Sequence, residues 1–162
     1  MNFESIIKYV ETLKNENGSY SSVYGMKGTL YGTCYALQTI YYLTNRSTIS
    51  EQTRDFILNC QDQQTGYFIG PEFQKFDFIN NKHDNEHLLL HLLCTVIPFL
   101  IDFRIKPKYD FSDAKKFLNK EYLIPWLKRR DWSDAWLEGN NLLFVGELLV
   151  YFRDIEKEPK AG

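Results

Sequence analysis

The sequence predicts an all-α protein built from helical hairpins. Apolar residues recur at the three- and four-residue spacing of helices, glycine-containing turns separate these stretches, and one turn pattern occurs twice. No stretch alternates between apolar and polar residues as a half-buried strand does, and no Asn-Gly hairpin occurs. The 162 residues correspond to one domain. We expect this domain to span 1–155, with a frayed polar tail at 156–162.

The first helices follow from this spacing. A first helix begins after Asn2, a residue type that caps helices, and ends before Gly18. A second helix is expected over 31–43. Thr48 and Glu51 have the spacing of a capping box, in which each side chain bonds the other residue's backbone N–H, so a third helix should follow them.

A proline complicates the fourth helix. Residues 62–83 lack helical periodicity and are expected to be irregular. Asp84 should cap a helix over 85–103. Because Pro98 lacks a backbone N–H and its ring crowds the preceding turn, we expect a kink or break near Thr95.

Shorter helices complete the chain. Weaker periodicity predicts helices at 111–118 and 120–130, the second interrupted by Pro125. Asn140 or Asn141 should cap the last helix. The expected total is about six or seven helices.

Composition narrows the class of protein. A net charge of −2 gives no general attraction to nucleic acid, so no such partner is expected. The longest apolar stretch, 88–103, contains His91, Pro98 and Asp102, and is too short and too polar for a membrane span. The three cysteines have no close pairing and should be buried free thiols. With no basic leader visible, the expected location is the cytoplasm.

Charge is unevenly distributed along the chain. Residues 104–130 contain nine basic and three acidic residues. This basic segment is either a solvated face or a site for a polyanion or another subunit.

One turn pattern occurs twice. Residues 61–70 read Gln-Asp-Gln-Gln-Thr-Gly-Tyr-Phe-Ile-Gly, and a weaker copy occupies 14–20. With one residue of slack, Gly18 aligns with Gly66, and the aromatic residues two positions later also align. A glycine permits the positive φ of a sharp helix exit, and the Gln61 side chain can bond the backbone of the adjoining turn.

The pattern Gln-Asp-x-x-Thr-Gly-Tyr-Phe-x-Gly at 61–70 resembles the glutamine–glycine–aromatic turn of the α/α-toroid superfamily, which includes prenyltransferase β-subunits and squalene cyclases. The resemblance covers roughly residues 3–103. It implies outer helices that alternate with inner helices lining a central cavity. A full toroid needs about five or six helix pairs and at most three fit here, so we expect an incomplete α/α-toroid. It would self-associate as a homo-oligomer or be completed by a second half-domain.

The sequence departs from the family in its chemistry. The Asp-x-Asp-Asp acid motif of the cyclases is absent, and Asp131-x-x-Asp134 does not replace it. The zinc ligands of the prenyltransferases have no residue-by-residue counterparts here. The resemblance therefore implies the cavity but identifies no reaction.

Three histidines mark the strongest candidate site. His83, His87 and His91 follow one another at intervals of four, which forms a stripe on one helix. The resemblance places this stripe on an inner helix. There His87 and His91, with Glu86 and Asp131, are candidate catalytic or substrate-contacting groups, since imidazole titrates near neutral pH. Alternatively, the histidines bond the loop that precedes the helix and have only a structural role.

Two metal-binding hypotheses remain as alternatives. Residues 83–87 match the His-x-x-Glu-His pattern of some zinc proteases, whose fold is however α/β. His87, His91 and Cys94 could also bind zinc as a generic metal site. No cofactor is the main expectation.

Aromatic residues provide candidate ligand contacts. Trp132 and Trp136 lie beside several carboxylates, a combination found in sugar-binding clefts, although tryptophans also pack short helices together. Tyr35 and Tyr67 are further candidate substrate-binding residues, and Tyr31 could also face a cavity mouth.

Two functional hypotheses follow. The first is an enzyme-related domain that binds a small molecule, a carbohydrate or isoprenoid-like substrate, between its inner helices. The second is a non-catalytic interaction or scaffold module that binds another subunit through its helical ends and its basic segment. Fold alone does not choose between them.

Overall fold

The computed structural model describes residues 2–73 and 85–157, and this part of the chain is all-α, as predicted. It contains six α-helices and one 3-10 helix: α1 (Phe3–Thr12), α2 (Leu30–Thr44), α3 (Glu51–Asn59), α5 (Glu86–Asp102), η1 (Ala114–Leu118), α6 (Lys120–Lys128) and α7 (Ala135–Asp154). Within these ranges the only β-type pairings are three isolated bridges.

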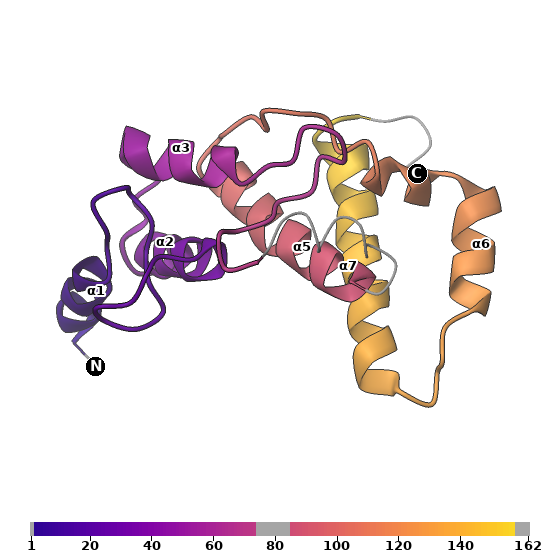
Figure 1. Ribbon diagram of the computed structural model, residues 1–162, viewed down its shortest axis with the longest axis horizontal. Coiled ribbons are helices and arrows are strands. Elements are labelled where there is room, and N and C mark those ends of the chain that lie inside the picture. The colour runs from indigo at the N-terminus through magenta and orange to yellow at the C-terminus, as the bar shows by residue number, and fades with distance from the viewer. Residues whose placement is uncertain (1, 74–84, 158–162) are drawn as a thin grey trace.

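Three helices form the centre of the molecule. Helix α5 packs against α2 on one side and α7 on the other, while α1 and α3 contact α2. In Figure 1, α1 and α6 lie at opposite ends of the long axis. The 3-10 helix η1 contacts both α6 and α7. A central row of α2, α5 and α7 therefore has α1 and α3 at one end and η1 with α6 at the other.

Helix α5 contributes more buried residues than any other helix of the described part of the chain. Ten of its 17 residues are buried, from Leu89 to Leu100. A helix that is apolar nearly all round must be covered on several sides, and α5 is covered by both of its neighbours. Groups on the first turn of α5 consequently lie between α2 and α7.

The structure confirms one predicted helix cap and corrects others. The side chain of Asn2 accepts a hydrogen bond from Glu4 N, as expected of an N-cap. The cap of α3 is Ser50, whose Oγ accepts from Thr53 N, so the predicted Thr48 capping box is wrong. Ser50 directly precedes the first helical residue, whereas Thr48 is two residues too early.

The predicted break of α5 near Thr95 and the interruption of α6 at Pro125 are wrong, whereas a kink in α5 stays a prediction. Helix α5 continues through Pro98, and α6 continues through Pro125. Pro98 lies four residues before the end of α5, where packing against α2 and α7 holds the helix together. The predicted cap Asp84 lies outside the described residues.

The last helix begins earlier than predicted. Its N-cap is Asp134, whose side chain accepts from Leu137 N at 3.0 Å, so Asn140 and Asn141 are inside the helix. Glu138 and Asn141 are buried side chains of its first two turns. The prediction failed because asparagine was interpreted as a local cap, although Asn141 has its partners on neighbouring side chains.

The two predicted turns have the same hydrogen-bond pattern. Asn15 N donates to Ser19 O in the first, and Asp62 N donates to Tyr67 O in the second, both at 2.8 Å. The second turn has one residue more, which confirms the predicted slack. Gly18 and Gly66 have φ values of +84° and +77°, a region that favours glycine.

Each turn packs against the backbone of a segment that comes later in the sequence and lies at or just before the start of a helix. Gly18 faces the backbone of residues 52–53 at the start of α3, and Gly66 faces the backbone of residues 110–111 before η1. The buried side chain of Gln61 fastens the second contact. Its amide donates to Gly66 O and Tyr109 O, and its Oε1 accepts from Lys108 N and Tyr109 N. The predicted role of this glutamine is confirmed.

The prediction for the three cysteines is confirmed. Cys34, Cys60 and Cys94 are free and buried, as predicted, and burial raises the pKa of the Cys34 and Cys94 thiols well above the ordinary range. Across 2–73 and 85–157, none of the helices combines the length and hydrophobicity required to cross a bilayer.

Candidate functional site

Two histidines lie side by side at the start of α5, and each is bound to a different neighbouring helix. His87 Nδ1 is 2.8 Å from Asn141 Oδ1 on α7, and His91 Nδ1 is 3.2 Å from the Tyr31 hydroxyl on α2. The two rings are 6.2 Å apart between centroids, and both residues are half-buried. The predicted stripe therefore becomes a fixed pair that links all three central helices. His83 lies outside the described residues.

A chain of buried groups fixes the orientation of His87. The Asn141 amide donates from Nδ2 to Glu138 Oε2 at 3.0 Å, and Glu138 is 3.5 Å from Arg130. A carboxylate only accepts, so the amide nitrogen must face Glu138 and the amide oxygen must face His87. His87 therefore donates its Nδ1–H to Asn141. Neutral His87 then has an unprotonated Nε2, which is the form required of a base.

His91 has a more apolar environment. Its ring stacks on Phe144 at 5.1 Å with an angle of 7° between the planes, and it also contacts the Tyr31 ring. Burial, with a smaller contribution from the neighbouring His87, lowers the pKa of His91 below its ordinary value. Burial, with Tyr35 and Glu72 as smaller causes, raises the pKa of Tyr31, so its hydroxyl stays protonated.

The two nitrogens of each histidine ring differ in their hydrogen bonding. Across residues 2–73 and 85–157, no side chain or backbone group hydrogen-bonds Nε2 of His87 or His91. Both Nδ1 atoms are therefore held by a partner on a neighbouring helix, and neither Nε2 atom has a hydrogen-bond partner among the described residues. Histidines that act in catalysis or binding are oriented in this way by a bond to the other ring nitrogen.

The lowered pKa of His91 predicts a specific pH dependence of stability. Below an ordinary histidine pKa of about 6.5, the unfolded chain binds a proton at His91 more readily than the folded chain does. The free energy of unfolding should therefore fall as pH drops from about 6.5 through the lowered pKa. Urea unfolding of wild type and His91→Gln at several pH values measures this term as the change in their difference. A difference that is constant with pH would contradict the prediction.

Glu86, a predicted catalytic residue, is engaged by cationic and aromatic partners. Its carboxylate accepts from Trp126 Nε1 at 2.7 Å and lies 3.5 Å from Lys116 Nζ and 3.6 Å from Arg130. Arg130 also pairs with Glu138 and stacks over the Trp126 ring. Glu86 thus connects the start of α5 to η1 and α6, and Arg130 joins it to the chain that orients His87.

Three predicted site residues lie in the turn before α7 or at the start of this helix, away from the hydrogen bonds of the histidine pair. Asp131 accepts from the backbone and hydroxyl of Ser133, which lowers the pKa of its carboxyl, and it is fully exposed. Trp132 and Trp136 are exposed, the latter at 82%. In the described part of the chain, no hydrogen bond or ring contact links Asp131, Trp132 or Trp136 to His87 or His91.

The two predicted tyrosine contacts differ from each other. Tyr35 is half exposed, and its ring stacks on Tyr31 with 6.1 Å between centroids. Tyr67 is buried in the core beside the second turn. Tyr35 therefore lies near the histidine pair through Tyr31, whereas Tyr67 is a packing residue.

The alternative metal site finds no support in the geometry. Within 2–73 and 85–157, no three His, Cys, Asp or Glu side chains are grouped so that they could hold a metal ion. Cys94 is buried, and its Sγ donates to Phe144 O at 3.3 Å. His87, His91 and Cys94 therefore do not form the predicted ligand set.

A groove between α5 and α7 lies away from the histidine pair. A hollow of about 660 Å³ is lined by α5 and α7 residues around Ile97 and Leu143, with Tyr42 from α2. His87 and His91 are not among its lining residues. The histidine pair is thus at the N-terminal end of α5, while the groove follows the later turns of the helices.

Sequence reasoning missed Phe144 and the role of Asn141. Glu138, Asn141 and Phe144 follow one another at intervals of three, which is the signal of one helix face. All three residues lie on one face of α7, which begins at Ala135.

Comparisons with models of known protein families, with curated proteins and with solved structures find no match for this chain.

Proposed function

We propose that the histidine pair is an acid–base site that binds a hydroxylated small molecule, with carbohydrate as the ligand class. The observation that carries this proposal is the orientation of His87 by Asn141, Glu138 and Arg130, which leaves an unprotonated Nε2. Such an atom accepts a proton from a ligand hydroxyl.

His91 complements His87 in this proposal. When the Tyr31 hydroxyl donates to His91 Nδ1, the neutral His91 ring has its proton on Nε2 and can donate to a ligand oxygen. Its lowered pKa keeps the ring neutral near pH 7. One histidine then accepts and the other donates, which suits two hydroxyl groups of one sugar. The exposed face of Tyr35 supplies a surface on which a sugar ring can stack.

We also propose a relationship with the α/α-toroids as an incomplete member. Its support is the repeated turn with a positive-φ glycine and the alternation of peripheral helices with the central row of α2, α5 and α7. In this proposal the ligand binds at the N-terminal ends of inner helices.

The proposal predicts the protonation state of each ring. Long-range ¹H–¹⁵N spectra should show the Nδ1–H tautomer for His87 and the Nε2–H tautomer for His91. Asn141→Leu should remove the preference at His87, because the acceptor of its Nδ1–H is lost. Asn140→Leu, one residue away on the same helix, is the matched control and should leave both rings unchanged. An Nε2–H tautomer of His87 in the wild type would contradict the assignment.

Ligand binding is tested separately in the same spectra. Titration with cellobiose and with maltose should shift the ring signals of His87, His91 and Tyr35, and His87→Gln should weaken binding about tenfold. Unchanged signals up to the solubility limit of both sugars would remove carbohydrate as the ligand class. The tautomer assignment would still stand or fall on its own spectra.

A further inference from the structure

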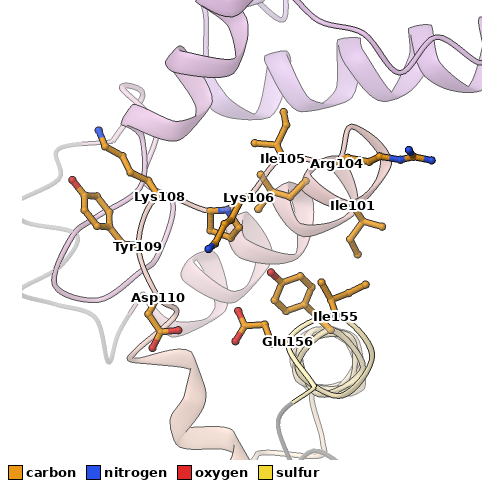
Figure 2. Close-up of a pocket in the computed structure, with 12 residues that line it drawn as sticks. Ile101, Arg104, Ile105, Lys106, Lys108, Tyr109, Asp110, Ile155 and Glu156 are labelled. Carbon is orange, nitrogen blue, oxygen red and sulfur yellow. The ribbon is translucent and has the colours of Figure 1, made fainter.

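Two hollows lie next to each other at the C-terminal ends of α5 and α7. Both are lined by Ile101, Tyr151 and Ile155, so they share one apolar wall. The first, about 710 Å³, extends along residues 104–110 and is drawn in Figure 2. The second, about 660 Å³, is the groove between α5 and α7 described above.

The first hollow, termed the basic hollow, has uncompensated positive charge. Arg104, Lys106 and Lys108 line it together with Asp110 and Glu156. Both carboxylates bind one further cation, Lys115, at 2.9 and 3.1 Å. Figure 2 shows Lys106 and Glu156 around the hollow and Arg104 at its outer edge. Four basic side chains therefore face two acidic ones.

The lining cations have no ion pair among the residues that the structure describes. In the described part of the chain, neither Arg104 nor Lys106 forms an ion pair, and the Lys108 ammonium contacts only the neutral groups of Asn59 and the Tyr109 ring. With Lys115 and the two carboxylates included, the hollow has a net charge of about +2 that another molecule could compensate.

The second hollow, termed the acidic hollow, has the opposite charge. Asp102, Glu147 and Asp154 line it, and no cation is among its lining residues. Asp154 pairs with its neighbour Arg153 at 2.7 Å. Asp102 and Glu147 have no ion pair within the described ranges, which leaves about −2.

Exposed apolar side chains connect the two hollows. Five large ones in this region are between 42% and 71% exposed: Tyr42, Ile101, Leu143, Val150 and Ile155. All five line the acidic hollow, and the two isoleucines also border the basic one. A contiguous apolar surface with charged borders is typical of a protein–protein contact.

We propose that a second copy of this chain covers this surface in a two-fold symmetric dimer. An axis through the Ile101 and Ile155 wall places the acidic hollow of each copy against the basic hollow of the other. The charges then compensate twice, and the apolar wall packs on itself. A second copy fits better than an unrelated partner because both signs of charge, in matching amounts, lie on one chain around one apolar strip.

The dimer goes beyond the proposed ligand site and is independent of it. The histidine pair lies at the other end of α5, and none of its residues lines either hollow. Loss of the dimer would therefore leave the ring tautomers of His87 and His91 as they are. The two proposals can fail separately.

Sedimentation equilibrium of the full chain tests the dimer directly. We expect a monomer–dimer equilibrium that weakens as NaCl increases, because facing charges are screened. Lys106→Glu and Asp102→Lys should each weaken dimerisation at least tenfold, and the double variant should restore it to within threefold of wild type. Lys128→Glu, an exposed lysine at the end of α6 that lines neither hollow, is the matched control and should have no effect. Circular dichroism of each variant checks that the fold is retained.

Three outcomes would overturn the proposal. The first is a strict monomer at every accessible concentration. The second is a double variant that dimerises no better than the weaker single variant, because facing charges must rescue each other. The third is a monomer that binds laurate in a manner abolished by Lys106→Glu, which would assign the basic hollow to an anionic small molecule.

Discussion

Gly66→Ala is expected to destabilise the fold by about 4 kcal/mol, a large effect for a single methyl group. The residue has a φ of +77°, where an L-residue is strained by about 1–2 kcal/mol. An added Cβ would also overlap the carbonyl oxygen of Asp110 and the Cα of Phe111. Both obstacles are backbone atoms, so the contact between the second turn and the segment before η1 would have to open. Urea unfolding followed by circular dichroism measures the loss.

Two other glycines separate backbone strain from overlap. Gly25 has a similar φ of +79°, but no atom lies near the position of its Cβ, so Gly25→Ala should cost only about 1 kcal/mol. Gly139 is in α7 with open space around it, and Gly139→Ala should stabilise by about 1 kcal/mol because alanine favours helix. Equal losses for Gly66→Ala and Gly25→Ala would show that the turn does not pack as described.

Gln61→Leu is expected to cost about 3 kcal/mol, because the buried amide has four backbone partners. Leucine has a similar volume, so the loss would come from hydrogen bonds and not from a cavity. It would leave the N–H groups of Lys108 and Tyr109 and two carbonyl groups without these bonds. Thermal and urea unfolding of the variant measure the change in stability.

The neighbouring glutamine provides the control for this variant. Gln64 is in the same turn with an exposed side chain, so Gln64→Leu should change stability by less than about 0.5 kcal/mol. If Gln61→Leu were as mild as Gln64→Leu, water would have to replace all four bonds. The second turn would then not depend on this side chain for its attachment.

These two residues also show what sequence can predict. The glycine and the glutamine act through rules that are local: a positive φ at a helix exit and an amide within reach of the adjoining backbone. The copy at residues 14–20 has the same backbone bond across the turn, whereas Lys14 replaces the glutamine there. The fold class was predictable for the same reason, since helical spacing depends only on neighbours in sequence.

Helix starts were less predictable where more than one residue could act as a cap. Thr48 and Ser50 both precede α3, and only the backbone path shows that Ser50 is adjacent to the first turn. Asparagine is a common N-cap residue, yet Asn141 lies within α7, because Glu138 and His87 satisfy its side-chain amide. Tertiary partners decided these cases, and they are not encoded at short range.

The candidate site was predictable only in part. The four-residue interval predicted that His87 and His91 share a helix face. Their partners, Asn141 and Tyr31, are 54 and 60 residues away in sequence, so no local pattern identifies them. Trp132 was predicted from composition alone, and composition does not determine which way a turn faces.

The fastening of the second turn has a consequence for the order in which the chain folds. Gln61 finds its partners at residues 108–109, so the hairpin that starts at α3 closes only after about 50 further residues have been synthesised. The first turn closes on residues 52–53 at the start of α3, about 35 residues after Gly18. On a ribosome the N-terminal hairpin would therefore form early, and the centre of the molecule would wait for its C-terminal half. A chain stopped after α5 would lack the segment to which this turn is fastened.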